Sequence, residues 1–478
     1  MKKNEQHEET RPEERVSLKN KVGFGAGAVS ECIMSNSIGQ MAGYVLNLGL
    51  GVRPELVGWL LALPRFLDAF IDPAMGAWSD NFRSRWGRRR PFVFAGALLS
   101  ALIFSAMWFL PYGWSEWGYF WYFLIMSLIY YFAYTVWAVP WCAMGCEMTN
   151  DYNERTRIMA YRTFFMSVGG FVPAWLFALT KLPVFTDIVQ GARYVGCGTA
   201  LVMLVFGLVP VFFARERYDI KVQSQPKTGM TEGLKISFRN RPFLLLNMIV
   251  LIVCAGLFII NGLDPYVNIY YVWKGDITPA AIWVGWSSLA YQVSGILFVV
   301  PVSLLARYRG KKFSMAFFLA VSLIASLLKW VCYNPAHPWL IVIPSFLLSS
   351  GLCALWTLSN SMIADICDVG ELDTGRRLEG TFNAVGGWIR KVGLSLSLLV
   401  SGYVISSTGF DVARGAEQTA HTIFWMRLLA VFFPAAMITV ALILIRFYPI
   451  TEEKVREVRN ELRRRTRPGS DGLLPNGR

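Results

Sequence analysis

Two acids and a base stand close together in an apolar segment of the sequence, where charge needs a physical reason. Asp68 and Asp72 follow Arg65 in a run that otherwise consists largely of Phe, Leu, Ala and Ile. Spacings of three and four residues place the three side chains on one face of a helix. Two carboxylates this close in a low dielectric cannot both be ionised cheaply, and Arg65 can neutralise one of them. The other then needs a proton or a small hard cation, which oxygen ligands suit. The pattern predicts a cation or proton site, and a structural ion network is the alternative.

Lys391 is a second informative charge, because it also lies inside an apolar segment. If its helix packs against the segment of Asp68, its ammonium group could reach the two carboxylates. The alternative for Lys391 and the adjacent Arg390 is that both extend along their segment toward a polar surface. Glu31 and Asp264 are weaker candidates of the same kind, since any charge deep in a long apolar segment is a functional hypothesis.

The elements that carry these charges are predicted to be membrane-spanning helices. The chain is 54% hydrophobic and 16% charged, whereas a soluble domain has roughly 25% charged residues. Its apolar blocks are long enough to cross a hydrocarbon layer of roughly 30 Å as helices, and they do not alternate as barrel strands would. The fold class is therefore an all-α membrane protein with two six-helix bundles. We expect twelve spans, at about 22–49, 55–80, 91–111, 119–148, 158–185, 194–214, 242–271, 281–306, 313–332, 339–365, 379–405 and 421–447.

The formal charge of +14 reflects topology rather than nucleic-acid binding. Basic residues cluster in alternate loops, among them those at 83–90, 215–241 and 307–312. This is the positive-inside pattern, which predicts that both termini are cytoplasmic and that the lipid bilayer is the partner surface. The first twenty residues are polar, so no signal peptide is expected and the first span directs membrane insertion.

The chain is predicted to have five regions. These are a cytoplasmic tail (1–21), an N-terminal bundle (22–214), a cytoplasmic linker (215–241), a C-terminal bundle (242–447) and a basic tail (448–478). Both bundles place a Gly-and-base loop after their second span, as two parallel repeats would. The first loop resembles the loop motif of the major facilitator superfamily, at Gly76, Asp80, Arg85, Gly87 and Arg88. Asp365 and Glu371, near a cytoplasmic helix end, are predicted to act in a gate or a helix cap.

An intramembrane enzyme or a metal centre finds little support in the residue types. The eight cysteines form no CxxC pair, and the chain has three histidines, all near loops or tails. No nucleophile-and-base pair or HExxH motif occurs. We therefore predict no catalytic residues and no cofactor, with no metal beyond a possible Na⁺ at Asp68 and Asp72. A channel or receptor also fits less well than a transporter, because two repeats share one asymmetric charged site.

Taken together, the motifs resemble those of the glycoside-pentoside-hexuronide:cation symporter family, the melibiose permease group of the major facilitator superfamily. They occur in order along nearly the whole chain, as Gly23-Phe-Gly25, Asp68-Ala-Phe-Ile-Asp72-Pro73-Ala-Met-Gly76, Arg85-Trp-Gly87-Arg-Arg-Arg-Pro91, Tyr134-Thr135 with Pro140-Trp141, Asn153-Glu-Arg155-Thr-Arg157 with Tyr161-Arg162, Asn240-Arg-Pro-Phe243, Ala364-Asp365-Ile-Cys-Asp368-Val-Gly370-Glu371 and Lys391.

The resemblance implies symport of a sugar, glycoside or uronide with Na⁺, Li⁺ or H⁺ across a bacterial inner membrane by alternating access. Asp68 and Asp72 would bind the cation, with Thr135 and Lys391 completing the site. The sequence does not choose among the cations. For the solute, the candidate binding residues are Arg65, Arg162, Trp356, Ser30, Trp141 and Tyr134.

Two positions depart from the family pattern. Ser30 and Ala138 stand where the melibiose permease carries the carboxylates that hold sugar hydroxyls, and Glu31 is one residue away, on another helical direction. Loss of two charge-assisted acceptors argues against a galactoside. A different sugar, a hexuronide or another anion is left open, with Arg162, Lys391 and Arg65 as anion partners. An amphipathic lipid is the alternative solute.

Overall fold

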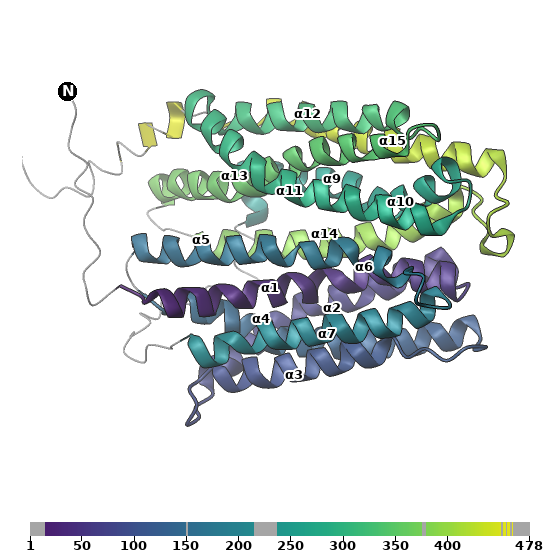
Figure 1. Cartoon of the computed structure of the whole chain (residues 1–478). Coiled ribbons are helices and arrows are strands. Elements are labelled where there is room, and N and C mark those ends of the chain that lie inside the picture. Colours follow the sequence, from purple (N-terminus) through teal and green to yellow (C-terminus); the bar gives the residue numbers. More distant parts are fainter. Residues whose placement is uncertain are drawn as a thin grey trace, which may run out of the picture.

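The computed structural model describes residues 15–149, 152–214, 237–374, 379–450, 453–455, 457, 458 and 461. These residues form helices and connecting loops without a strand. Figure 1 shows the helices running side by side in two sets, purple to teal and teal to yellow. The first set is α1 (Leu18–Ala42), α2 (Pro54–Asn81), α3 (Arg90–Met107), α4 (Glu116–Glu147), α5 (Tyr152–Gly169), α6 (Phe171–Thr180) and α7 (Ile188–Phe213). The second set is α9 (Arg241–Asn261), α10 (Asp264–Val267), α11 (Ile277–Arg309), α12 (Lys311–Cys332), α13 (Val342–Thr374), α14 (Glu379–Ser407) and α15 (Ala420–Arg446).

Each of the twelve predicted spans is matched by one helix or by consecutive helical segments, so the predicted all-α membrane class is confirmed. Among the described residues, ten helical stretches are long and apolar enough to cross a membrane. The two remaining spans are α1 and α2, which carry Glu31 and the charges at 65, 68 and 72. Both acids of the predicted cation site, Asp68 and Asp72, thus lie in a span that is less apolar than those ten, and burial against other helices makes such charges tolerable in a membrane.

The first helix of each set breaks in the same way before its loop. α1 continues into a π-helical segment, Gly43–Gly49, and α9 continues through α10 into another, Asn268–Val272. The two breaks touch, because the hydroxyl of Tyr266 donates to Oδ1 of Asn47 at 2.8 Å. π-Helical turns are uncommon and occur mostly at functional positions. Their repetition supports an internal repeat of six spans.

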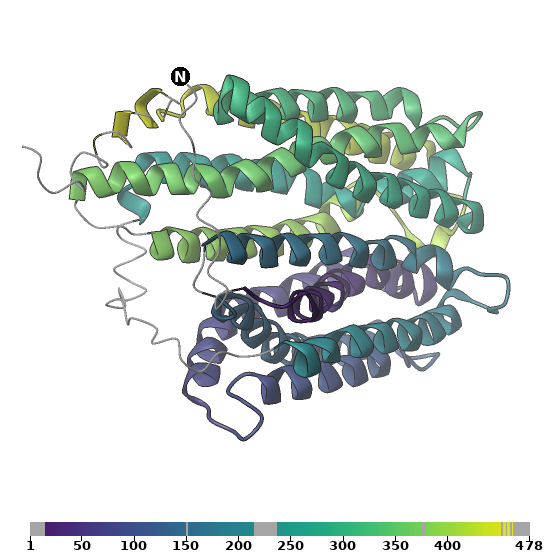
Figure 2. The same ribbon diagram turned by 60° about the vertical axis from the view of Figure 1, so that its left-hand side comes forward.

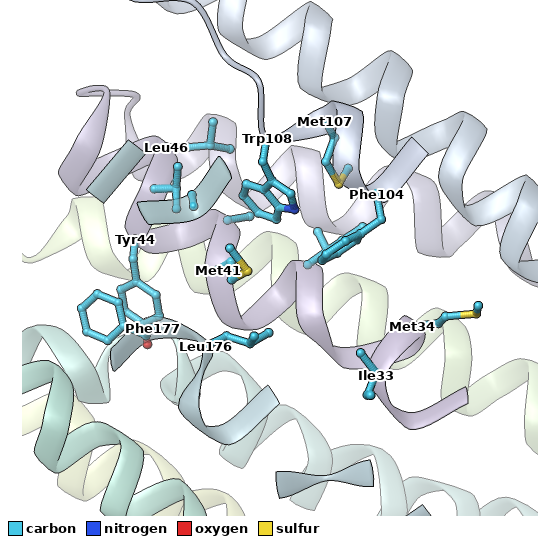
Figure 3. Close-up of a cluster of buried hydrophobic side chains, with 14 of the residues drawn as sticks. Ile33, Met34, Met41, Tyr44, Leu46, Phe104, Met107, Trp108, Leu176 and Phe177 are labelled. Atoms are coloured by element: carbon cyan, nitrogen blue, oxygen red, sulfur yellow. The ribbon is translucent and has the colours of Figure 1, made fainter. Parts of the chain in front are cut away.

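Close packing inside the N-terminal set depends on glycines that lie against the backbone or the ring of an aromatic residue. A Cβ at Gly96 would lie 2.6 Å from the backbone nitrogen of Trp137, and one at Gly145 would lie 2.1 Å from the ring of Phe24. Small residues of this kind let membrane helices approach closely. Figure 3 shows part of the resulting core, where Tyr44 and Phe177 stack with ring centroids 3.8 Å apart.

The two ends of the bundle differ in charge, and we name them for reference. The basic face carries the loop at 82–89 and Lys311, and the opposite face carries the loops at 108–115, 181–187 and 333–337. On the basic face, Arg88 and Arg89 contact Glu147 at 2.5 and 2.6 Å. In the second set, Lys311 contacts Asp365 at 2.5 Å. Both repeats therefore join a base at or just after the end of the loop to an acid near the end of the fourth or the tenth span.

The two sets of helices meet most closely toward the opposite face. α14 lies against α2. Figure 1 and Figure 2 show the second set of helices, teal to yellow, running alongside the first. A Cβ at Gly58 would lie 2.9 Å from the carbonyl oxygen of Leu399, and one at Gly402 would lie 2.3 Å from that of Pro54. A second contact joins α6 to α11, where Trp175 and Trp286 pack edge to face at 5.4 Å. One continuous hydrophobic cluster consequently includes residues of both sets at this face.

Candidate functional site

Asp68 is held in the interior by a neighbouring helix. It lies near the middle of α2, with 6% of its surface exposed. Thr135, which is fully buried on α4, donates its hydroxyl hydrogen bond to Oδ1 of Asp68. The second oxygen, Oδ2, accepts from Nζ of Lys391 at 2.9 Å. A buried carboxylate must be paired and hydrogen-bonded to persist, and Asp68 meets both conditions.

Lys391 joins the two sets of helices through this acid pair. It lies on α14, and its Nζ also contacts Oδ2 of Asp72, one turn along α2. The side chains of Lys391 and Asp72 are 40% and 32% exposed, whereas that of Asp68 is 8% exposed. The arrangement brings together the four residues that the sequence suggested for a cation site. It consists of two carboxylates, a hydroxyl and one ammonium that bridges both acids.

Arg65 takes a different position from the one expected. Its Nε donates to the hydroxyl of Tyr131 at 3.0 Å, and its second guanidinium arm donates to the carbonyl oxygen of Ser35. The expectation that Arg65 neutralises one acid is corrected, because Lys391 makes the contacts with both carboxylates. Arg65 instead ties α2 to α1 and α4, and it lines a cavity of about 180 Å³.

Arg162 forms a second charged contact in the N-terminal set. Its guanidinium lies 3.6 Å from Oε2 of Glu31 and 5.1 Å from the ring centroid of Trp141. The side chains of Arg162 and Glu31 are 27% and 16% exposed. Glu31 therefore faces α5, a direction that Ser30 does not share.

Two predicted solute-binding residues are corrected by their burial. Ser30 is fully buried and donates its hydroxyl to the carbonyl oxygen of Met203 on α7 at 2.8 Å. Trp141 is 1% exposed, and its ring lies in a stack between Phe24 and Trp137. Both side chains serve packing, because the helical direction of each points between helices rather than into a cavity.

A cavity of about 370 Å³ lies between the two sets of helices and takes in Trp356. That tryptophan, on α13, is 41% exposed and lines the cavity. Tyr134 is half-buried on α4, with its ring 6.3 Å from that of Tyr131. The volume falls in the usual range for small-molecule sites, roughly 300 to 1,000 Å³.

The predicted loop and gate residues lie at the basic face. Gly76 and Asp80 are in α2, although the side chain of Asp80 lies outside the described part. In the loop that follows, Arg85 is exposed, Gly87 has a φ of 112°, and Arg88 pairs with Glu147. Asp365 pairs with Lys311, and Glu371 is half-buried in the last turn of α13. Within the described residues, no group of three or more His, Cys, Asp or Glu could hold a metal ion.

Sequence reasoning missed one buried base. Lys329, on α12, is 3% exposed and contacts Oδ2 of Asp264, while the hydroxyl of Tyr333 donates to Oδ1 at 2.9 Å. A single lysine in a span that is otherwise apolar was the available signal. Its partner comes from a segment more than sixty residues away, so spacing could not pair them.

Comparisons with known proteins agree with this architecture. The model of the MFS/sugar transport protein family matches residues 23–452. An uncharacterized symporter of Synechocystis, sll1374, is 26% identical over 95% of this chain and 98% of its own. The putative glycoside/cation symporter YagG of Escherichia coli is 25% identical over 94% of this chain and 95% of its own. A crystal structure of the nucleoside transporter NupG superposes with a TM-score of 0.66 at 14% identity, over 90% of this chain and 100% of that one.

Proposed function

We propose that this chain carries a sugar-type solute together with a cation. The premise is that the chain belongs to the MFS/sugar transport protein family and has the major facilitator fold. The substrate class follows the similar proteins, among which are a glycoside/cation symporter and an isoprimeverose transporter. Transport would proceed by alternating access of the two six-helix bundles.

The contact of Lys391 with Asp68 and Asp72 is the observation that supports coupling most directly. The ammonium on the C-terminal bundle contacts two acids on the N-terminal bundle and offsets one of their two negative charges. A proton or Na⁺ that binds at these acids competes with Lys391 for the same oxygens. Cation binding would therefore weaken a bond between the bundles, which is what coupling requires: a ligand with different affinities for two states.

The closed opposite face supports the alternating-access part of the proposal. Glycines at 58 and 402 let α2 and α14 meet backbone to backbone on that side. Such a contact either forms fully or separates, so it suits a two-state closure. The half-exposed Lys391 and Asp72 lie nearer the basic face and remain accessible.

The distribution of bases supports a cytoplasmic location for the basic face. We propose that both termini are cytoplasmic and that the chain lies in a bacterial inner membrane, as the similar E. coli symporter YicJ does. Transport would then bring the solute from the opposite face toward the cytoplasm.

A sugar fits the cavity better than an amphipathic lipid does. The wall of the larger cavity includes the amides of Asn36, Gln40 and Gln292, several serine hydroxyls, and Trp356. Amide groups hydrogen-bond hydroxyls, and an aromatic face covers the apolar side of a sugar ring. The chain is a transporter by family, and we propose no catalytic reaction for it.

The test is uptake by the purified protein in sealed vesicles under an inward Na⁺ or H⁺ gradient. We expect accumulation of a labelled sugar only with one of these gradients, and loss of accumulation in Asp72→Asn. Asp411→Asn, an exposed acid in the loop before α15 with Arg414 at 3.6 Å, is the control and should leave uptake unchanged. Unchanged gradient dependence in Asp72→Asn would refute the assignment of the cation site.

A further inference from the structure

The wall of the larger cavity that belongs to the C-terminal bundle contains a charged triad. We define it as Asp264, Lys329 and Tyr333. Asp264 is 24% exposed at its side chain, and Lys329 is 4% exposed. Each carboxylate oxygen receives one donor from the triad, and an ionised carboxylate has about four acceptor positions in all. Acceptor capacity on Asp264 is therefore left over toward the cavity.

Two further polar atoms in the same wall have no partner. Asn268 is 2% exposed and donates from its amide to the carbonyl oxygen of Ala280, yet its Oδ1 has no hydrogen-bond partner among the described residues. The buried hydroxyl oxygen of Ser287 is likewise without a partner in this part of the chain. Both residues line the cavity. A buried polar group without a partner is costly, and a rotation of either side chain toward the cavity would give its oxygen a ligand or a water as partner.

The charges of the cavity wall decide the class of ligand. Asp264 and Lys329 are the charged residues that line this cavity, and they pair with each other. An anionic solute would enter a wall whose one cation is already neutralised, and it would face the carboxylate as well. A neutral solute with several hydroxyls instead supplies donors to Asp264 and Asn268 and exchanges hydrogen bonds with Ser287.

We propose that this wall is a solute subsite for a neutral sugar or glycoside, in which Asp264, held by Lys329 and Tyr333, accepts the hydroxyl hydrogen bonds. The inference rests on the proposed sugar transport and narrows it from sugars and uronides to uncharged members. Asp264 would also provide, in the C-terminal bundle, the carboxylate acceptor that is missing from the N-terminal bundle at Ser30 and Ala138.

A purely structural ion pair between α10 and α12 is the competing explanation. It accounts for Lys329, which would be expensive to bury alone. It does not account for Oδ1 of Asn268 or the hydroxyl of Ser287, because neither makes a contact that would hold helices together. Replacement of Ser287 therefore separates the two explanations without disturbing the pair.

The experiment is counterflow in sealed vesicles with equal cation concentrations on both sides, so that no gradient is required. The probes are D-glucose, D-galactose, D-xylose and methyl glucosides, each compared as a competitor with D-glucuronate and D-galacturonate. The variants are Ser287→Ala and Asp264→Asn. The matched control is Ser127→Ala, whose hydroxyl on α4 is equally buried and unpartnered but does not line the cavity.

We expect neutral sugars to compete at least about tenfold better than the matching uronates. Loss of one neutral hydrogen bond in Ser287→Ala should raise the apparent KM about threefold to tenfold with unchanged thermal stability. Asp264→Asn should raise it about thirtyfold or more, since its bonds are charge-assisted. Ser127→Ala should match the wild type.

Two results would overturn the subsite while leaving sugar transport in place. Uronates could compete as well as the neutral sugars, or Ser287→Ala could equal Ser127→Ala. If no probe exchanged at all, the proposed sugar transport would be wrong, and the subsite would be wrong with it. Failure of the cation proposal would give a different result. Counterflow of the sugar would persist, but accumulation would no longer respond to Na⁺ or H⁺ gradients.

Discussion

Replacement of Lys391 by methionine should convert the acid pair into a site whose stability depends on an added cation. Methionine keeps the length and packing of the side chain but removes its charge. Asp68 and Asp72 would then lie together with Thr135 as the donor and without their ammonium partner. One of the acids must take up a proton or a cation for the pair to persist.

The size of the effect follows from the contact distance and the exposure. At an effective dielectric constant of about 20, unit charges about 3 Å apart attract by roughly 5 to 6 kcal/mol. The side chains of Lys391 and Asp72 are 40% and 32% exposed, which weakens this attraction. We take about 3 kcal/mol as the loss, the lower end for breaking a buried pair. Removal of a competitor of that strength raises cation affinity by up to about 100-fold.

The assay is thermal unfolding of the purified protein, first across a NaCl titration at constant ionic strength and then across pH. Without the cation, Lys391→Met should unfold at a lower temperature than the wild type. With rising cation it should recover, since a ligand at 100 times its Kd stabilises by about 2.7 kcal/mol. Recovery with Na⁺ would identify sodium as the coupling ion, and recovery with falling pH alone would identify the proton.

Arg390→Met is the matched control, because Arg390 is the adjacent base on α14 and makes no ion pair with a described residue. It should show the cation response of the wild type. If Lys391→Met showed that same response, the acids would not form a cation site and the coupling argument would be wrong.

The remaining predictions concern other contacts. Thr135→Val should raise the cation concentration needed for half-maximal uptake about tenfold, because Asp68 loses the hydrogen bond from the Thr135 hydroxyl. Thr135→Ser keeps a hydroxyl at this position and should behave as the wild type does. Gly58→Val should slow transport at least about tenfold and lower the thermal stability of the state that is closed at the opposite face, since its side chain would clash with the backbone at Leu399. Burial raises the pKa of Glu154, but hydrogen bonds, first that from Lys21, outweigh burial and hold the pKa below its usual value. The contact should therefore stabilise fully above the unfolded pKa of about 4.3 and be lost as pH falls through the folded pKa. At neutral pH, Glu154→Gln should lower the free energy of unfolding by about 2 kcal/mol relative to the wild type. The resulting difference in Tm between the two proteins should vanish in acid.

The helix pattern was readable from the sequence because membrane spans are defined by local composition. Runs such as Phe243 to Ile260 exceed the length needed to cross the hydrocarbon layer, whatever they pack against. The grouping of Asp68 with Asp72 was equally local, since one helical turn fixes their spacing. Lys391 was placed beside them correctly only with the help of the two-bundle arrangement that the family resemblance implied.

Side-chain direction between helices was not readable in the same way. The sequence supplied Ser30, Trp141 and Arg65 as solute-binding candidates, but rotation about each helix axis decides what a residue faces. Ser30 faces Met203 on α7, and Trp141 lies between two rings, so neither reaches a cavity. Helix rotation depends on packing across the whole bundle, to which glycines such as Gly145 contribute by fitting against one particular ring, that of Phe24.

By itself, the sequence determined that this chain is an all-helical membrane protein with two repeats and a carboxylate pair in its second span. Hydrophobic length, the positions of bases and one-turn spacing are properties of short segments, so they survive without knowledge of the fold. Only the tertiary structure decided which charges pair. Lys391 lies 323 positions from Asp68, and Lys329 lies 65 positions from Asp264. Those contacts exist because distant helices pack side by side, and no local pattern encodes which face each helix turns to the other.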